Sequence, residues 1–393
     1  MALRGIVEGF YGKPFDPDQR LRLIESISGF DDAAYLYAPK NDPWHRIRWR
    51  RPYPDGQWKS IAEAIARSAD LGVRFIFGIS PLGFGNNDHR RVLSKAERAV
   101  REGAGGLALL FDDLDEPLRP ELAGTQSGLV VRMGERFDLP LLVCPSVYCA
   151  EFQKQLDEGY TEELSGAIPE EATLLWTGGE VVSRSLGPAD MEYGERLLGH
   201  RVAAWDNLLA DDYCLRRIYM GDVRGRISEG YGYLLNPSSC FPVALHAVYS
   251  MLAECGAAAA APPEFEGHEE GWRVLRMFHY LPWECGPGGE SLLEEMVGAI
   301  TGEVPRGLPE RLRKMRGNLR ELQDRLPHLS GGYDLLPYVL DVSRFLGIAL
   351  HALSAPADVP ALRELSRLLF ERLPFEHPLA KALAGCAGSG GRR

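Results

Sequence analysis

The sequence of 393 residues has no uninterrupted apolar run near the roughly 20 residues that a membrane-spanning helix needs. It is also poor in positive charge: 44 lysines and arginines face 55 acidic residues, giving a formal net charge of −11. We therefore expect neither a nucleic acid nor a membrane as partner, because phosphate binding requires clustered positive charge. The Arg-rich stretch 45–51 is the local exception, and Trp49 within it favours a solvated or substrate-facing loop.

Paired cysteines and phosphate-binding motifs are missing as well. The 7 cysteines are scattered without a CxxC spacing, which argues against a zinc site and against a dense disulfide framework. Strand-like sequence begins at Leu3, so we expect no signal peptide and a cytoplasmic location. Neither GxGxxG nor GxxxxGK[ST] follows any apolar run, which disfavours an open, doubly wound nucleotide-binding sheet.

Short apolar runs alternate, as far as Pro237, with segments whose apolar residues recur with the periodicity of a helix. Runs of this kind, bounded by turn residues, are typical of βαβ units with a parallel sheet. Eight such units match the size of a (β/α)8 TIM barrel, about 250 residues. The α/β barrel is therefore the predicted fold, with an open doubly wound sheet as its rival. The eight runs are 3–7, 33–37, 73–79, 106–111, 139–143, 173–176, 202–205 and 232–235.

Beyond Pro237 the pattern becomes helical. We expect a catalytic barrel over 1–240 and an α-helical domain over 241–393, with a linker at 257–263 and a disordered tail at 386–393. The helical domain is also a candidate surface for a homodimer. The helix-period segments are 244–254, 269–280, 291–300, 308–326, 335–353 and 359–373.

Two adjacent carboxylates, Asp112 and Asp113, follow the fourth predicted strand. Reacting groups of a barrel lie at the carboxyl ends of its strands. Adjacent carboxylates repel each other, so that one retains its proton, as a general acid requires. Two alternatives stay open: the beginning of a helix, where Asp is common, and a magnesium site that also includes Asp115 and Glu116.

Aromatic, amide and basic residues follow the other predicted strands. Taken singly, each has an ordinary explanation: Trp176 and Trp205 as packing, Lys40 as a solvated lysine, and Cys144 as a small buried residue. Together they favour a carbohydrate pocket, in which rings stack on sugar faces and Asp, Asn and Lys bind hydroxyls.

Seven segments resemble those of glycoside hydrolase family 84, the O-GlcNAcase and bacterial β-N-acetylglucosaminidase family. They occur in the family's order over about the first 240 residues. The segments are VEGFYGKPF, YAPKNDPWHR, FDDLDEP, CPSVYC, WTGGEVVS, WDNLLADDY and LNPSS.

The resemblance implies a retaining reaction in which the substrate's own 2-acetamido group attacks and forms an oxazoline, without a cofactor or metal. Asp112 would bind the acetamido N–H, and Asp113 would act as acid and then as base. The implied contacts to sugar hydroxyls come from Gly9, Lys40, Asp212 and Asn236. Asn207 would position the acetamido group, and its methyl pocket would be formed by Cys144, Tyr148, Thr177, Val181 and Trp205.

The expected activity is therefore that of an exo-β-N-acetylglucosaminidase acting on a β-GlcNAc-bearing glycoconjugate or an O-GlcNAc-modified protein. Hyaluronan or cell-wall-derived conjugates are alternative substrates for the same chemistry. The alternative from another functional class is a glycan-binding module without enzymatic activity. A sugar-phosphate enzyme is disfavoured, because acidic residues follow the seventh predicted strand, where a phosphate would bind.

Overall fold

The computed structural model describes residues 3–85, 87–114, 116–214, 217–256, 262–301, 303–355 and 359–372. Its contacts divide the chain into two compact units. The first contains Met1–Leu208, Val223–Ser239 and Met251–Ala257, and the second contains Leu209–Asp222, Cys240–Ser250 and Ala258–Arg393. Most of the predicted linker and the predicted tail at 386–393 lie outside the described residues. Pro263, the last linker residue, begins a short 3-10 helix.

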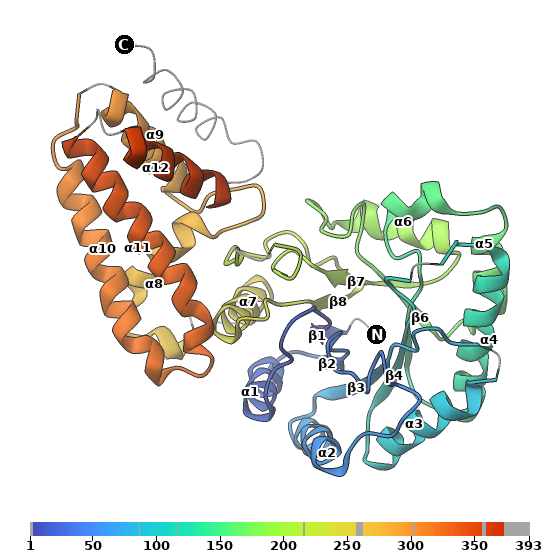
Figure 1. Cartoon of the computed structure of the whole chain (residues 1–393). Helices are drawn as coiled ribbons and strands as arrows, with labels where there is room; N and C mark the ends of the chain where they lie inside the picture. Colours follow the sequence, from blue (N-terminus) through green and yellow to red (C-terminus); the bar gives the residue numbers. More distant parts are fainter. Residues whose placement is uncertain are drawn as a thin grey trace. The chain divides into compact units, whose positions relative to one another are not determined.

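The first unit is a closed barrel of eight parallel strands in sequence order, which confirms the predicted TIM-barrel fold (Figure 1). The first and last strands close it, with Arg4 paired to Tyr233. The strands are β1 (Arg4–Glu8), β2 (Ala33–Tyr37), β3 (Arg74–Ile79), β4 (Gly106–Leu110), β5 (Leu141–Cys144), β6 (Thr173–Trp176), β7 (Val202–Asp206) and β8 (Gly232–Leu235).

Amphipathic helices follow most of these strands. The first of them begins at a capping box, in which the Asp16 side chain accepts from the Gln19 N–H and Gln19 bonds back to the Asp16 N–H. The β7–β8 connection differs from the eight predicted units, because its described residues contain no helix. The helices are α1 (Pro17–Ile27), α2 (Asp55–Asp70), α3 (His89–Arg101), α4 (Pro120–Arg136), α5 (Tyr160–Ala167) and α6 (Pro188–Leu198). Helix α7 (Phe241–Glu254) follows β8 in the chain, and its residues are divided between the two units.

The barrel interior is filled by side chains from alternating strand positions. Val7, Leu36, Leu110 and Leu234 belong to one buried cluster that also contains Trp205 at the carboxyl end of β7. Strand side chains alternate between the two faces, so every second residue points inward. The outward residues contact the surrounding helices, and the strand ends are left to carry polar groups.

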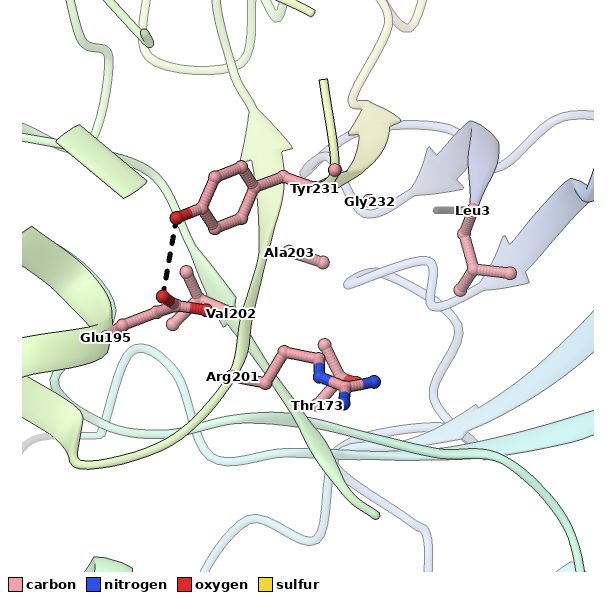
Figure 2. A pocket seen from close by; sticks show the side chains of 9 residues that line it. Leu3, Thr173, Glu195, Arg201, Val202, Ala203, Tyr231 and Gly232 are labelled. Carbon is pink, nitrogen blue, oxygen red and sulfur yellow. Dashed lines mark hydrogen bonds between the residues drawn. The ribbon is translucent and has the colours of Figure 1, made fainter. Parts of the chain in front are cut away.

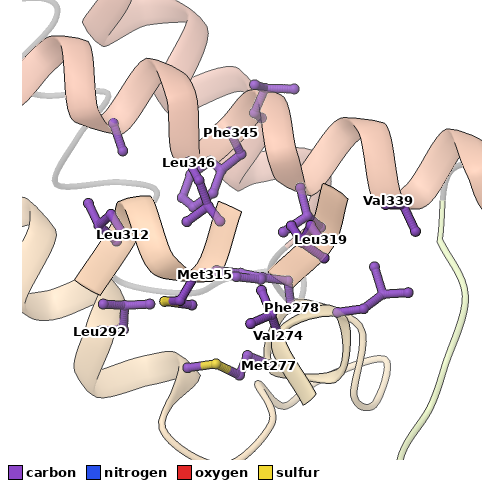
Figure 3. Packing of buried hydrophobic residues seen from close by; sticks show 14 of the residues in the cluster. Val274, Met277, Phe278, Leu292, Leu312, Met315, Leu319, Val339, Phe345 and Leu346 are labelled. Carbon is purple, nitrogen blue, oxygen red and sulfur yellow. The ribbon is translucent and has the colours of Figure 1, made fainter. Parts of the chain in front are cut away.

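The second unit is helical, with a core formed by one face of each helix (Figure 3). In α10 (Leu308–Arg325) the buried residues include Leu312 and Leu319, which lie on one helical face. Phe278 packs against Phe345, with 5.3 Å between ring centroids. The remaining helices are α8 (Glu269–Phe278), α9 (Gly289–Thr301), α11 (Gly332–Ser354) and α12 (Val359–Arg372).

Helix α11 is the one helix among the described residues whose length and apolar composition would allow it to cross a membrane. Core helices of globular proteins meet the same two criteria. In α11, Val339, Phe345 and Leu346 are fully buried in the helical core (Figure 3). These side chains are covered by protein in this structure.

Candidate active site

Asp112 and Asp113 follow β4 at the carboxyl end of the barrel, and their surroundings differ. Asp112 is buried, with 5% of its surface exposed, whereas Asp113 is exposed. Asp113 has a φ of +55°, in the left-handed region that L-residues rarely adopt. The backbone therefore turns between the two residues and gives each carboxylate an environment of its own.

The Asp112 carboxylate is held by Lys40, whose Nζ forms a buried ion pair with Oδ2. Lys40 Nζ also lies 5.5 Å from the centroid of the Trp205 ring. The other carboxylate oxygen, Oδ1, is buried and has no hydrogen-bond partner among the described residues. A buried oxygen without a hydrogen-bond partner raises the free energy of the folded protein, so Asp112 Oδ1 is suited to accept a hydrogen bond from a bound molecule.

The Asp113 carboxylate accepts hydrogen bonds from two tyrosines. Tyr11 donates to Oδ2 at 2.8 Å, and Tyr148 donates to Oδ1 at 2.7 Å. Burial, followed by the Asp113 charge, raises the pKa of both hydroxyls, so they remain protonated donors at neutral pH. Arg46 fixes the main chain by donating to the Asp113 carbonyl at 3.0 Å.

Side-chain amides connect four strand ends beside the carboxylates. The Gly9 N–H donates to Asn236 Oδ1 at 3.1 Å, and Asn236 Nδ2 donates to Asn207 Oδ1 at 2.9 Å. Asn207 Oδ1 also accepts from Trp205 Nε1 at 2.8 Å, while Asn207 Nδ2 donates to the Val181 carbonyl at 2.8 Å. This amide chain holds the Trp205 ring at the rim of the barrel.

The residues expected to form the acetamido methyl pocket lie close together. Cys144, Tyr148 and Trp205 belong to the buried cluster of the barrel interior, and Val181 packs against it. The Thr177 hydroxyl donates to the Glu180 carbonyl at 2.8 Å, which orders the turn before Val181. Burial raises the pKa of Cys144 well above its ordinary value, so its sulfur is an uncharged thiol rather than a nucleophile.

Two buried ion pairs lie at strand ends near these residues, and the sequence analysis assigned neither. Arg20 binds Glu8 through Nε at 2.8 Å and Nη2 at 3.0 Å. Arg226 binds Asp206 through Nε at 2.6 Å and Nη2 at 2.8 Å. Glu8 and Asp206 are strand-end carboxylates of the predicted kind, but their arginine partners, 12 and 20 residues further along the chain, have no motif that marks them.

Tyr11 and Arg46 are two more residues that the sequence analysis did not assign to the site. Both lie within the motif segments quoted above. Asp212 belongs to the second unit, so its contact with a sugar stays a prediction. Asp115, one of the four alternative magnesium ligands, lies outside the described residues. No group of three or more His, Cys, Asp or Glu residues in the described part of the chain is arranged to hold a metal.

A cavity of about 480 Å³ lies at the opposite end of the barrel, where the strands begin (Figure 2). Tyr231 donates to Glu195 across it at 3.3 Å. Since β7 begins at Val202 and β8 at Gly232, this cavity is separated from the carboxylate pair by the length of the strands. Its lining residues are Leu3, Thr173, Glu195, Arg201, Val202, Ala203, Gly230, Tyr231 and Gly232.

Comparison with known proteins gives concordant matches. A family model described as β-N-acetylglucosaminidase matches residues 4–258. The protein O-GlcNAcases of Rattus norvegicus and Mus musculus are each 29% identical over 268 residues, which are 63% of this chain. The match covers only 29% of each of these longer relatives.

Among solved structures, a mutant of the Thermobaculum terrenum O-GlcNAc hydrolase superposes with a TM-score of 0.77. The superposition covers 99% of this chain and 94% of that chain at 19% sequence identity, and it shows a shared fold. The family model covers well over half of the present chain. The chain therefore belongs to the β-N-acetylglucosaminidase family, glycoside hydrolase family 84, whose members are glycoside hydrolases.

Proposed function

We propose that the protein is a retaining exo-β-N-acetylglucosaminidase that removes terminal β-linked GlcNAc by substrate-assisted catalysis. The observation that carries the proposal is the contrast within the carboxylate pair. Asp112 is buried, paired with Lys40 and has one oxygen without a partner, while Asp113 is exposed. One carboxylate is thus placed to orient the acetamido group, and the other to exchange protons with the leaving group and water.

In the first step, the acetamido carbonyl oxygen of the substrate attacks its own anomeric carbon, and the bond from that carbon to the leaving oxygen breaks. Asp112 Oδ1 accepts a hydrogen bond from the acetamido N–H, which favours the positive charge that develops there. Asp113 gives its proton to the leaving oxygen. The product of this step is a protonated oxazoline (an oxazolinium ion), whose N–H stays hydrogen-bonded to Asp112, and Asp113 is left as a carboxylate.

In the second step, Asp113 takes a proton from water, and the water oxygen attacks the anomeric carbon and opens the oxazoline. Two inversions at the same carbon give net retention of configuration. The tyrosine hydroxyls that donate to Asp113 are suited to this stage, because hydrogen bonds to a charged carboxylate are stronger than those to a neutral acid. They hold the carboxylate in place between the two proton transfers.

The remaining site residues bind the sugar. The Gly9 N–H is engaged by Asn236, so Gly9 contacts a hydroxyl through its carbonyl oxygen. Cys144, Val181 and Trp205 surround the acetamido methyl group, which distinguishes N-acetylglucosamine from glucose. The natural substrate is an O-GlcNAc-modified protein or a related glycoconjugate, and a homodimer through the helical unit stays a prediction, as does the cytoplasmic location.

The test is hydrolysis of a chromogenic aryl β-N-acetylglucosaminide by the wild type, Asp112→Asn and Asp113→Asn. Both variants should lose activity strongly. The loss of activity in Asp113→Asn should be smaller for substrates whose leaving phenol has a low pKa, because a good leaving group needs less help from an acid. The Asp112→Asn loss should be independent of the leaving group.

Product stereochemistry is the second readout. Proton NMR of the first-formed sugar should show the β-anomer before it equilibrates in water. Initial release of the α-anomer would refute the retaining mechanism. Failure of the wild type to cleave any N-acetylglucosaminide would refute the activity itself and favour the glycan-binding alternative.

A further inference from the structure

The Arg-rich loop, residues 45–51, is a feature that the reaction chemistry leaves unexplained. We propose that this loop, together with Tyr11 and Leu82, is a docking surface for an acidic segment of the glycosylated polypeptide. The proposal rests on the function proposed above and specifies the substrate class of the same site. It requires a surface that is rigid, continuous with the acid Asp113 and positively charged.

The loop is held firmly by groups around it. Lys95 Nζ donates to the carbonyls of Trp44 and Arg51 at 2.8 and 2.9 Å, which fixes both ends of the loop. In its middle, Trp49 Nε1 donates to the Leu82 carbonyl at 2.9 Å. The loop after β2 is thereby fastened to the loop after β3. A surface that is ordered before binding loses less entropy when a ligand docks.

Exposed apolar side chains lie on these two loops and, in the case of Tyr11, on the loop after β1. Ile47 is 70% exposed, Tyr11 41% and Leu82 37%, which is unusual for large apolar residues in the first unit. Arg46 contacts Tyr11, with its Cζ 5.9 Å from the ring centroid, and its Nη2 donates to the Asp113 carbonyl. The surface is therefore continuous with the residue that protonates the leaving group.

The loop is positively charged in an acidic protein. Arg50 is paired with Asp88 at 2.7 Å, but Arg46, Arg48 and Arg51 form no ion pair with any carboxylate in the described part of the chain. The Arg48 and Arg51 side chains are exposed. With a net charge of −11 for the whole chain, such a cluster would attract a negatively charged ligand specifically to this rim.

His45, the first residue of the loop, is anchored in the protein interior. Its ring is fully buried, and its Nδ1 lies 3.0 Å from the Gly78 carbonyl. Burial, and then the charges of Lys40, Arg46 and Lys95, lower its pKa to about 3.

The distances suit a peptide flank. Arg48 is two residues beyond Arg46, so their Cα atoms are at most about 7.6 Å apart. An extended peptide advances about 3.3–3.6 Å per residue. An acidic residue two positions from the glycosylated serine is thus separated from it by about the same length as Arg48 from Arg46, whose side chain bonds the Asp113 carbonyl.

The test uses three synthetic peptides with one Ser(β-GlcNAc), flanked by Glu, Gln or Lys. For each, kcat/KM is divided by the value for a chromogenic aryl β-GlcNAc measured with the same enzyme. We expect the Glu peptide to be preferred, and the preference to decrease at high ionic strength. In Arg48→Ala/Arg51→Ala the Glu-to-Gln preference should fall roughly three- to tenfold, as expected for two exposed charge pairs.

The matched control is Arg201→Ala, which removes an exposed arginine at the opposite end of the same barrel. Its preference should equal that of the wild type. Arg48→Glu should reverse the preference toward the Lys peptide, which a loss of folding could not produce. Equal cleavage of all three peptides, or cleavage of the aryl substrate alone, would overturn the docking surface. A wild type inactive on the aryl substrate would instead refute the activity.

Discussion

Adding a single methyl group at Gly9 should damage both folding and activity. A Cβ built at this position would lie 2.3 Å from Cζ2 and 2.7 Å from Cη2 of Trp205. Carbon atoms pack at about 3.5–4.0 Å, so the indole must move by more than about 1 Å. The ring is buried and tied to Asn207 by a 2.8 Å hydrogen bond, which leaves it little freedom to move.

Overpacking of this kind costs about 1–3 kcal/mol. A domain of 150–250 residues loses roughly 2–4 °C in Tm per kcal/mol, so Gly9→Ala should lower Tm by roughly 2–12 °C. Displacing Trp205 by about 1 Å also deforms the pocket, and a misplacement of that size lowers kcat/KM by roughly 100-fold. Thermal unfolding and the chromogenic assay measure the two effects.

Gly128→Ala is the matched control, because Gly128 lies inside α4 and an added Cβ meets nothing within 4 Å. That change should stabilise the protein by about 0.5–1 kcal/mol. In addition, Trp205→Phe removes the atoms that clash. The double variant Gly9→Ala/Trp205→Phe should therefore lose less stability than the sum of the losses in the two single variants. A Gly9→Ala protein with wild-type Tm and activity would refute the packing argument.

Three further changes test the interactions around the site. As the pH falls from about 6.5 toward 3, the unfolded chain binds a proton that folded His45 excludes, so up to roughly 4–5 kcal/mol of stability is lost in this window. The free energy of unfolding, measured with urea at several pH values, should depend less on pH in His45→Asn. Arg226→Met leaves Asp206 buried without its partner and should cost about 3–5 kcal/mol in the same assay, whereas a near-neutral result would mean that water reaches the carboxylate. Tyr148→Phe removes a hydrogen bond to charged Asp113 worth about 1.5–3 kcal/mol, so kcat should fall roughly 10- to 100-fold, and an unchanged kcat would exclude this role.

The barrel was predictable because its signal is local and repeated. Each strand is a short buried run between turn residues, and the observed bounds differ from the predicted ones by no more than a few residues. The fourth run was predicted to end at Phe111, and β4 ends at Leu110. That the described residues between β7 and β8 form no helix was not predictable, because a connection of that length could equally contain a surface helix with its loops.

The position of the carboxylate pair at a strand end was also predictable, but the partners of its members were not. Lys40 was expected to contact sugar hydroxyls, and it forms an ion pair with Asp112, 72 residues along the chain. Lys95 lies in a segment of mixed charge typical of a surface helix, yet it is buried and binds two carbonyls. Contacts of this kind depend on which strands become neighbours when the barrel closes, and sequence periodicity carries no information on that pairing.

The amide chain at the rim has a consequence for biosynthesis. The bond between the Gly9 N–H and Asn236 joins residues 227 positions apart, one after the first strand and one after the last. During synthesis on the ribosome, a nascent chain that ends before Asn236 leaves the Gly9 N–H without this partner. Until β8 has been made, its pairing with β1 is also absent. The proposed active site should therefore be completed only once β8 has emerged, and we expect incomplete translation products to lack the proposed glycosidase activity.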